Sequence, residues 1–131
     1  MIVVDASVLA PALADDGPDG ERARGELTTD ALAAPHLIDI EVASVIRKAR
    51  LRGDFSDQRA RQALDDLRSL PLTRFPHDRF LERIWELHTT LTTYDAAYVA
   101  LAEALKAPLV TADAKLAKAA GPACTFRLVS A

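Results

Sequence analysis

The sequence predicts an α/β domain whose central, mainly parallel sheet of about five strands is flanked by helices. Short apolar runs rich in β-branched residues occur at residues 2–4, 109–111 and 126–129, and weaker ones at 32–34 and 72–75. Longer segments with the 3.6-residue period of helices separate these runs. Alternation of this kind is typical of parallel sheets that helices cover on both faces.

Residues that begin and end helices divide the segments between the strands. Pro35 precedes a helix expected over about 36–52, and Gly53 ends it as glycine commonly does. Ser56 is a typical N-cap for the next helix, which runs to about residue 70. The stretch 15–20 has the composition of a loop, and we expect it to be the most mobile segment. Further helices are expected over residues 6–14, 78–91, 92–106 and 114–120.

Length and composition indicate one ordinary globular domain over residues 1–131. Half of the residues are hydrophobic and 27% are charged, which excludes intrinsic disorder as the default. Cys124 is the only cysteine, so an internal disulfide is excluded and a reducing, intracellular compartment is indicated. We expect neither a signal peptide nor a membrane span, because Asp5 interrupts the first apolar run. The net charge of −3 argues against a uniformly basic surface that coats nucleic acid.

Two aspartates follow apolar strands and precede helices. Asp5 follows the run IVV, and Asp113 has the same position in LVTADAKLAKA. Ligands of open α/β sheets bind outside the carboxyl ends of the strands, so these two acids are well placed to meet in one site. Each could instead be a helix N-cap, and taken singly that interpretation is favoured.

Two further acids border apolar helix faces. Asp95 lies near the start of a helix that is apolar nearly all round, although it could simply complement the helix dipole there. Glu41 is expected inside the helix over 36–52, at the rim of its apolar face, where capping does not explain it. No lysine or arginine lies three or four residues away to form a local ion pair. Coincidence is the remaining alternative for Glu41.

Four carboxylates gathered in one cleft would require a cation or protons. Two unit charges about 4 Å apart repel by roughly 4 kcal/mol at an effective dielectric constant of 20. Oxygen ligands favour hard cations, so Mg²⁺ or Mn²⁺ is expected, with several waters retained. Such an ion can polarise a phosphate, lower the pKa of a water and orient an in-line attack.

Four sequence blocks together resemble the PIN-domain ribonucleases, and among them the VapC toxins of bacterial type II toxin–antitoxin pairs. The blocks are VVDASVL, PHLIDIEVASVIRKA, TTYDAAYVALAEAL and LVTADAKLAKA, which contain Asp5, Glu41, Asp95 and Asp113 in the order and spacing of the family. The resemblance covers nearly the whole chain. It implies a three-layer PIN-like fold and an acidic pocket that cuts single-stranded or loop RNA with Mg²⁺.

The resemblance also implies roles and partners. Asp5 and Asp95 are similar in position to the principal metal ligands, while Glu41 and Asp113 complete the catalytic pocket directly or through waters. Ser7 and Thr111 match polar positions that support such pockets, and a helix-cap role for each is an equal alternative. The implied protein is a cytoplasmic toxin of a bacterium or archaeon, a homodimer in most cases. Its implied partners are RNA and a small antitoxin that inserts a basic side chain among the acids.

Other interpretations fit less well. Haloacid dehalogenase phosphatases require a second aspartate two residues after the first, and Ser7 occupies that position. The basic run at residues 47–52 could contact RNA phosphates, but a solvated helix end is the more frequent explanation. His36, His77 and His88 lack the spacing of metal ligands or of a catalytic triad, so we expect surface or packing positions. A silent PIN-like module that binds protein or RNA, or a housekeeping PIN nuclease, is the alternative function.

Overall fold

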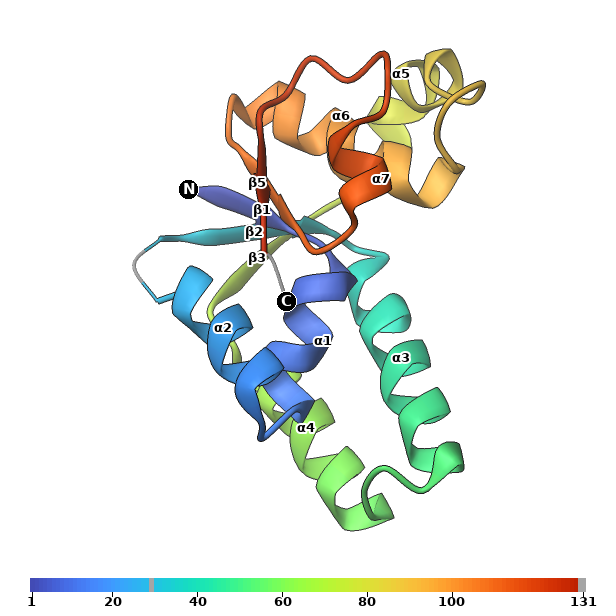
Figure 1. Ribbon diagram of the computed structural model, residues 1–131. Helices are drawn as coiled ribbons and strands as arrows, with labels where there is room; N and C mark the ends of the chain where they lie inside the picture. Colours follow the sequence, from blue (N-terminus) through green and yellow to red (C-terminus); the bar gives the residue numbers. More distant parts are fainter. Residues whose placement is uncertain (29, 130–131) are drawn as a thin grey trace.

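The computed structural model describes residues 1–28 and 30–129 and contains a five-stranded sheet of parallel strands. The order across the sheet is β3-β2-β1-β4-β5 (Figure 1). This arrangement confirms the predicted fold class. In chain order, the strands are β1 (Ile2–Val4), β2 (Leu32–Pro35), β3 (Leu72–Phe75), β4 (Leu109–Thr111) and β5 (Phe126–Leu128).

The central strand β1 has β2 and then β3 on one side, and β4 and then β5 on the other. Ile2 pairs with Leu32 of β2, while Val3 pairs with Leu109 of β4. Every residue of β1 and β4 is buried, as expected for strands with helices on both faces. The order of the strands therefore switches between β1 and β4, which is where open α/β sheets form their binding crevices.

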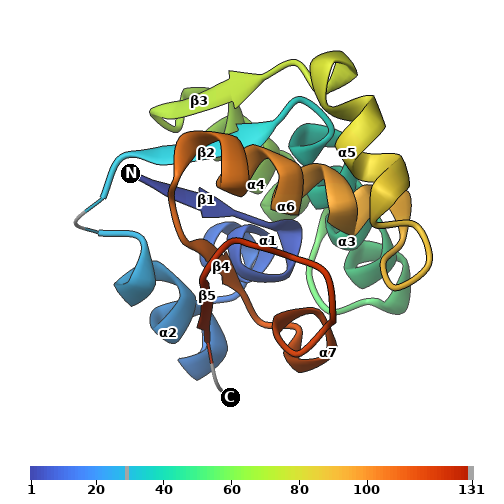
Figure 2. The same cartoon turned by 90° about the horizontal axis from the view of Figure 1, so that it is seen from above.

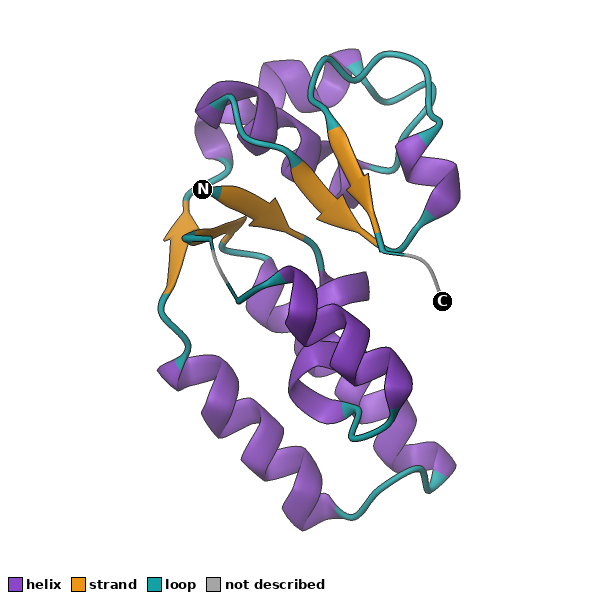
Figure 3. Ribbon diagram, turned by 60° about the vertical axis from the view of Figure 1, so that its left-hand side comes forward, coloured by secondary structure: helices purple, strands orange, loops and turns teal. Residues whose placement is uncertain are grey.

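Helices form a layer on each side of the sheet (Figures 1 and 2). On one side lie α1 (Ala6–Ala14), α2 (Pro18–Glu26), α3 (Ile38–Arg52) and α4 (Asp57–Ser69). On the other side lie a 3₁₀ turn, η1 (Asp78–Phe80), and the helices α5 (Leu81–Glu86), α6 (Thr93–Leu105) and α7 (Ala114–Ala117). Figure 3 shows the strands between these two groups of helices.

Helix α6 is the most deeply buried helix of the structure. All residues from Ala96 to Ala102 are buried, and the helix packs against β1 and β2 on one side and α5 on the other. Its small and apolar side chains permit this close packing on both sides. The first turn of α6 is thereby fixed close to the carboxyl ends of the central strands.

Three predicted boundaries differ from the structure. The loop predicted over 15–20 is wrong beyond Gly17, because α2 begins at Pro18, which occupies a first-turn position that suits proline. The single helix predicted over 78–91 is interrupted: α5 ends at Glu86 and turns follow. The last helix ends at Ala117 instead of about residue 120.

Helix α5 presents two large apolar side chains to solvent. Leu81 and Trp85 are 60% and 63% exposed, whereas Ile84 and Leu87 are buried. Within the described part of the chain, no helix is long and apolar enough to cross a membrane.

Candidate acidic active site

Asp5 and Asp113 lie at adjacent strand ends, and each also caps a helix. Asp5 is the N-cap of α1, with Oδ1 accepting a hydrogen bond from the Ser7 amide at 3.1 Å. Asp113 is the N-cap of α7, with Oδ1 accepting from the amides of Lys115 at 2.9 Å and Leu116 at 3.3 Å. Because these bonds all end on Oδ1, capping leaves the second oxygen of each carboxylate able to bind a ligand.

The side chains of Ser7 and Thr111 connect the two strand ends. The Ser7 hydroxyl donates to Asp5 Oδ1 at 2.5 Å and accepts from the Ala112 amide at 2.8 Å. It also lies 3.3 Å from the hydroxyl of Thr111, whose oxygen accepts from the Asp113 amide at 3.1 Å. This chain of hydrogen bonds holds the loop after β1 against the loop after β4. Both residues therefore lie between the two acids.

Asp95 and Glu41 approach the same region from helix starts on opposite sides of the sheet. Asp95 is half-buried in the first turn of α6, and its amide donates to the N-cap Thr92 at 3.1 Å. Glu41 lies in the first turn of α3, because that helix begins at Ile38 and not at residue 36. Glu41 is within α3 as expected, but it lies so close to the start of the helix that dipole complementation is open to Glu41 as it is to Asp95.

The pKa values show that the four carboxylates interact. Burial and, to a smaller extent, the charge of Asp95 raise the pKa of Asp5 to about 6, against the hydrogen bonds of Ser7 and Thr111 that lower it. The pKa of Glu41 is raised by burial, lowered by Tyr98 and raised again by Asp95. Burial also raises the pKa of Asp95, with the charge of Asp113 adding to the effect. Asp95 therefore links all four acids of the site electrostatically.

Tyr98 is a fifth member of this group that the sequence analysis missed. It is 1% exposed, and its pKa is raised far above the usual value by burial, by Glu41 and by the charges of Asp5 and Asp95. Its hydroxyl has no hydrogen-bond partner among the described residues, although Glu41 is close enough to interact with it. A tyrosine three residues after Asp95, in an otherwise apolar helix, was the available signal.

The donors that could hold a metal ion are carboxylate oxygens. Among the described residues, no three His, Cys, Asp or Glu side chains are close enough to form a metal site by themselves. Direct coordination would therefore use fewer protein ligands, with waters in the other positions, which is the arrangement that Mg²⁺ prefers. His36, His77 and His88 are exposed, and the ring of His88 stacks on Trp85 at 4.0 Å between centroids.

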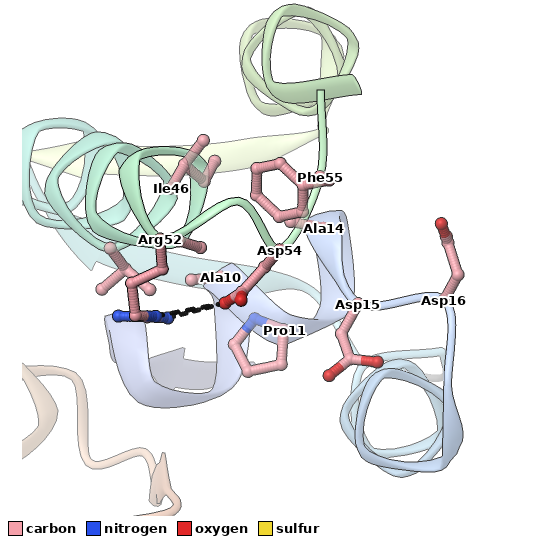
Figure 4. A pocket seen from close by; sticks show the side chains of 11 residues that line it. Ala10, Pro11, Ala14, Asp15, Asp16, Ile46, Arg52, Asp54 and Phe55 are labelled. Carbon is pink, nitrogen blue, oxygen red and sulfur yellow. Dashed lines mark hydrogen bonds and ion pairs between the residues drawn. The ribbon is translucent and has the colours of Figure 1, made fainter. Parts of the chain in front are cut away.

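A separate pocket lies between α1 and α3 (Figure 4). It has a volume of about 470 Å³ and apolar walls that include Pro11, Ile46 and Phe55. Its rim carries Arg52, which forms an ion pair with Asp54 at 2.9 Å. None of the four acids lines this pocket, so it is distinct from the acidic site. Arg52 ends the basic run of α3, and its exposed side chain is engaged in this pair.

The fold and the site define a parallel α/β domain with a group of interacting carboxylates at the switch between its central strands. A family model described as "PIN domain" matches residues 2–122. The chain therefore belongs to the PIN-domain family, among the VapC ribonucleases, as its similarity to curated relatives shows. This membership confirms the resemblance found in the sequence.

Three relatives from Mycobacterium tuberculosis match almost their full length. Ribonuclease VapC1 is 45% identical over 128 residues, which cover 97% of this chain and 96% of that protein. Ribonuclease VapC9 is 43% identical, with 98% of each chain covered. Ribonuclease VapC12 is 38% identical, with 99% of this chain and all of the relative covered.

Two solved structures share the fold. PAE2754 from Pyrobaculum aerophilum superposes with a TM-score of 0.66 at 28% identity, covering 95% of this chain and 81% of that one. Mycobacterium tuberculosis VapC20, described as a toxin that cleaves the sarcin–ricin loop, superposes with a TM-score of 0.69 over 88% of this chain and 92% of its own. At 14% identity, this second likeness supports the fold alone.

Proposed function

We propose that this protein is a Mg²⁺-dependent endoribonuclease and the toxin of a type II toxin–antitoxin pair. The observation that carries the proposal is the electrostatic coupling of Asp95 to Asp5, Glu41 and Asp113 at the strand switch point. The relatives VapC1, VapC9 and VapC12 are named ribonucleases, which supports RNA as the substrate. A module that only binds partners has no need for four mutually repelling carboxylates, so the silent alternative is less favoured.

Asp5 and Asp95 would hold the metal ion, Mg²⁺ or Mn²⁺. Burial raises the pKa values of both, and so does the charge of a neighbouring acid, Asp95 for Asp5 and Asp113 for Asp95, so a bound cation would relieve an unfavourable interaction. Glu41 and Asp113 would complete the coordination through waters, because among the described residues no three such side chains are close enough to bind one ion directly. When bound, the metal supplies a polarised phosphate and an activated water.

The protein side chains supply the fixed geometry of the reaction. Ser7 holds Oδ1 of Asp5, and the amides of α7 hold Oδ1 of Asp113, so each carboxylate can turn only one oxygen to the substrate. Asp95 is fixed by the rigid, buried helix α6. Such preorganised charges need no rearrangement when the scissile phosphate is in place.

The negative charge of the acidic site and the exposed apolar side chains of α5 support two protein partners, an antitoxin and a second copy of the chain. An antitoxin that places an arginine or lysine among these acids would neutralise them and block the substrate. Leu81 and Trp85 on α5 are large, apolar and exposed, which supports a homodimer formed through this face. The substrate is a single-stranded or loop RNA.

The central test is RNA cleavage by purified protein with and without Mg²⁺ or Mn²⁺. We expect cleavage with either ion, no cleavage in EDTA, and a loss of at least about 100-fold in Asp95→Asn, since a charge that stabilises the transition state is worth that much. Asp16→Asn, which changes an exposed aspartate outside the site, serves as the matched control. Equal activity of Asp95→Asn and wild type would exclude the acidic-site mechanism.

A second test separates the toxin from a housekeeping nuclease. Induced expression of the wild-type chain alone should arrest growth, and coexpression of the cognate antitoxin should restore it. Expression of Asp95→Asn at the same level should be harmless. Active nuclease that does not affect growth would favour the housekeeping role.

A further inference from the structure

Tyr98 buries a hydroxyl for which the packing of the protein gives no reason. The side chain is among the largest that are fully buried, and its hydroxyl is the one buried side-chain polar atom in the described chain without a hydrogen bond. Leaving such a group unpaired costs about 1–3 kcal/mol. Phenylalanine would fill the same space without this cost, so the hydroxyl calls for a function.

The position of Tyr98 on α6 directs attention to the acidic site. Tyr98 follows Asp95 by three residues, and side chains with this spacing lie on the same face of a helix. The helix packs against β1 and β2. Asp5 directly follows β1, and Glu41 lies in the first turn of α3, the helix that follows β2. The charges of Glu41, Asp5 and Asp95 all raise the pKa of Tyr98. The buried hydroxyl is therefore within electrostatic range of three of the four acids.

Chemistry distinguishes this hydroxyl from the groups around it. A neutral phenol can donate a hydrogen bond to a carboxylate, whereas ionised carboxylates can only accept one. Glu41 is half-buried and needs such a donor more than Asp5, which already has Ser7. By the distances and angles of the structure the Tyr98 hydroxyl has no hydrogen-bond partner, yet Glu41 is near enough for each group to shift the pKa of the other, so Glu41 is the acceptor best placed to pair with it.

We propose that Tyr98 is a positioning residue of the acidic site, whose hydroxyl anchors one oxygen of Glu41 and turns the other toward Asp95. The hydroxyl does not touch the reacting atoms; it acts through Glu41. The inference rests on the proposed function, because it assigns a support to the same metal-binding site. Supporting hydrogen bonds of this kind fix the orientation of metal ligands and are worth about 10–100-fold in affinity or activity.

The test compares Tyr98→Phe with Tyr94→Phe, the same chemical change one helical turn away at a side chain that is 63% exposed. The first readout is the Mg²⁺ concentration that gives half of the full thermal stabilisation, and the second is kcat and KM for RNA. In Tyr98→Phe we expect the half-saturating Mg²⁺ concentration to rise and kcat to fall, each by about 10–100-fold, with little change in KM. Tyr94→Phe should match the wild type in both readouts. Unchanged Mg²⁺ affinity and kcat in Tyr98→Phe would overturn the inference.

A metal-free experiment keeps this inference separate from the proposed function. If the wild type neither binds Mg²⁺ nor cleaves RNA, the proposed function fails, and the contact is then tested by a double-mutant cycle of Tyr98→Phe and Glu41→Ala in urea with EDTA, because alanine leaves no acceptor for the hydroxyl. A shift of the urea midpoint in the double variant that differs from the sum of the single shifts supports the anchor. Additive shifts show that the two side chains do not interact and refute it.

Discussion

Asp5→Asn should abolish activity and yet stabilise the protein at neutral pH when no metal is present. Asp5 is 6% exposed, and folding raises its pKa from 3.8 to about 6. At about 1.4 kcal/mol per pKa unit, holding this carboxylate ionised costs the native state about 3 kcal/mol. Asparagine removes the charge and keeps an oxygen to cap α1, although its amide needs a new partner. We therefore expect a net gain of about 1–3 kcal/mol in the free energy of unfolding.

The pH dependence gives the sign of this effect. Between pH 3.8 and about 6, the folded state binds more protons at Asp5 than the unfolded state, so wild-type stability falls as the pH rises through this window. The difference between Asp5→Asn and wild type should thus be full at pH 7 and decrease toward pH 4. Urea denaturation in EDTA at several pH values measures it.

The control for this experiment is Asp16→Asn. The pKa of Asp16 is lowered by its hydrogen bond to Arg59 and the attraction of that guanidinium, so its neutralisation should bring no gain in stability. Saturating Mg²⁺ should stabilise the wild type and leave Asp5→Asn unchanged, reversing their order. Lower or equal stability of metal-free Asp5→Asn at pH 7, or a difference independent of pH, would show that the reasoning about the buried charge is wrong.

Three further changes test the fold and the partners. Asp113→Ala should lower the free energy of unfolding by about 1 kcal/mol because the N-cap of α7 is lost, whereas Asp113→Ser keeps a capping oxygen and should retain the wild-type stability. Both variants should be inactive in RNA cleavage. An active Asp113→Ser variant would limit the role of Asp113 to capping. Gly53→Ala should cost about 1 kcal/mol in urea because its φ is +86°; no change would mean that the turn relaxes. Trp85→Lys should sediment as a monomer with unchanged circular dichroism, and a dimer would exclude this face from the interface.

Much of the fold follows from local signals in the sequence. The runs at Ile2–Val4 and Leu109–Thr111 are strands because buried parallel strands need continuous apolar side chains. Ser56 caps α4 and Gly53 ends α3 as their chemistry predicts. The proximity of Asp5 and Asp113 follows from the same reasoning, since parallel strands end at one edge of the sheet.

Other features depend on tertiary contacts that no local pattern encodes. Helix α2 buries only Gly20 and Ala23, so it lacks the apolar period that reveals a helix, and its proline and acidic first turn were the only signals. Gly20 allows a close approach there, because an added Cβ would lie 1.7 Å from the Asp15 carbonyl oxygen. Tyr98 was missed in the sequence because its hydroxyl gains significance only from acids that other segments bring near it.

The strand order also determines when the site can exist during synthesis. The Ser7 hydroxyl accepts its hydrogen bond from Ala112, 105 positions later in the chain. β1 is the first strand to leave the ribosome, but β4, which completes its other side, is made only after α6. A nascent chain that carries Asp5, Glu41 and Asp95 still lacks the strand that aligns them. The acidic site therefore cannot assemble until β4 has been synthesised.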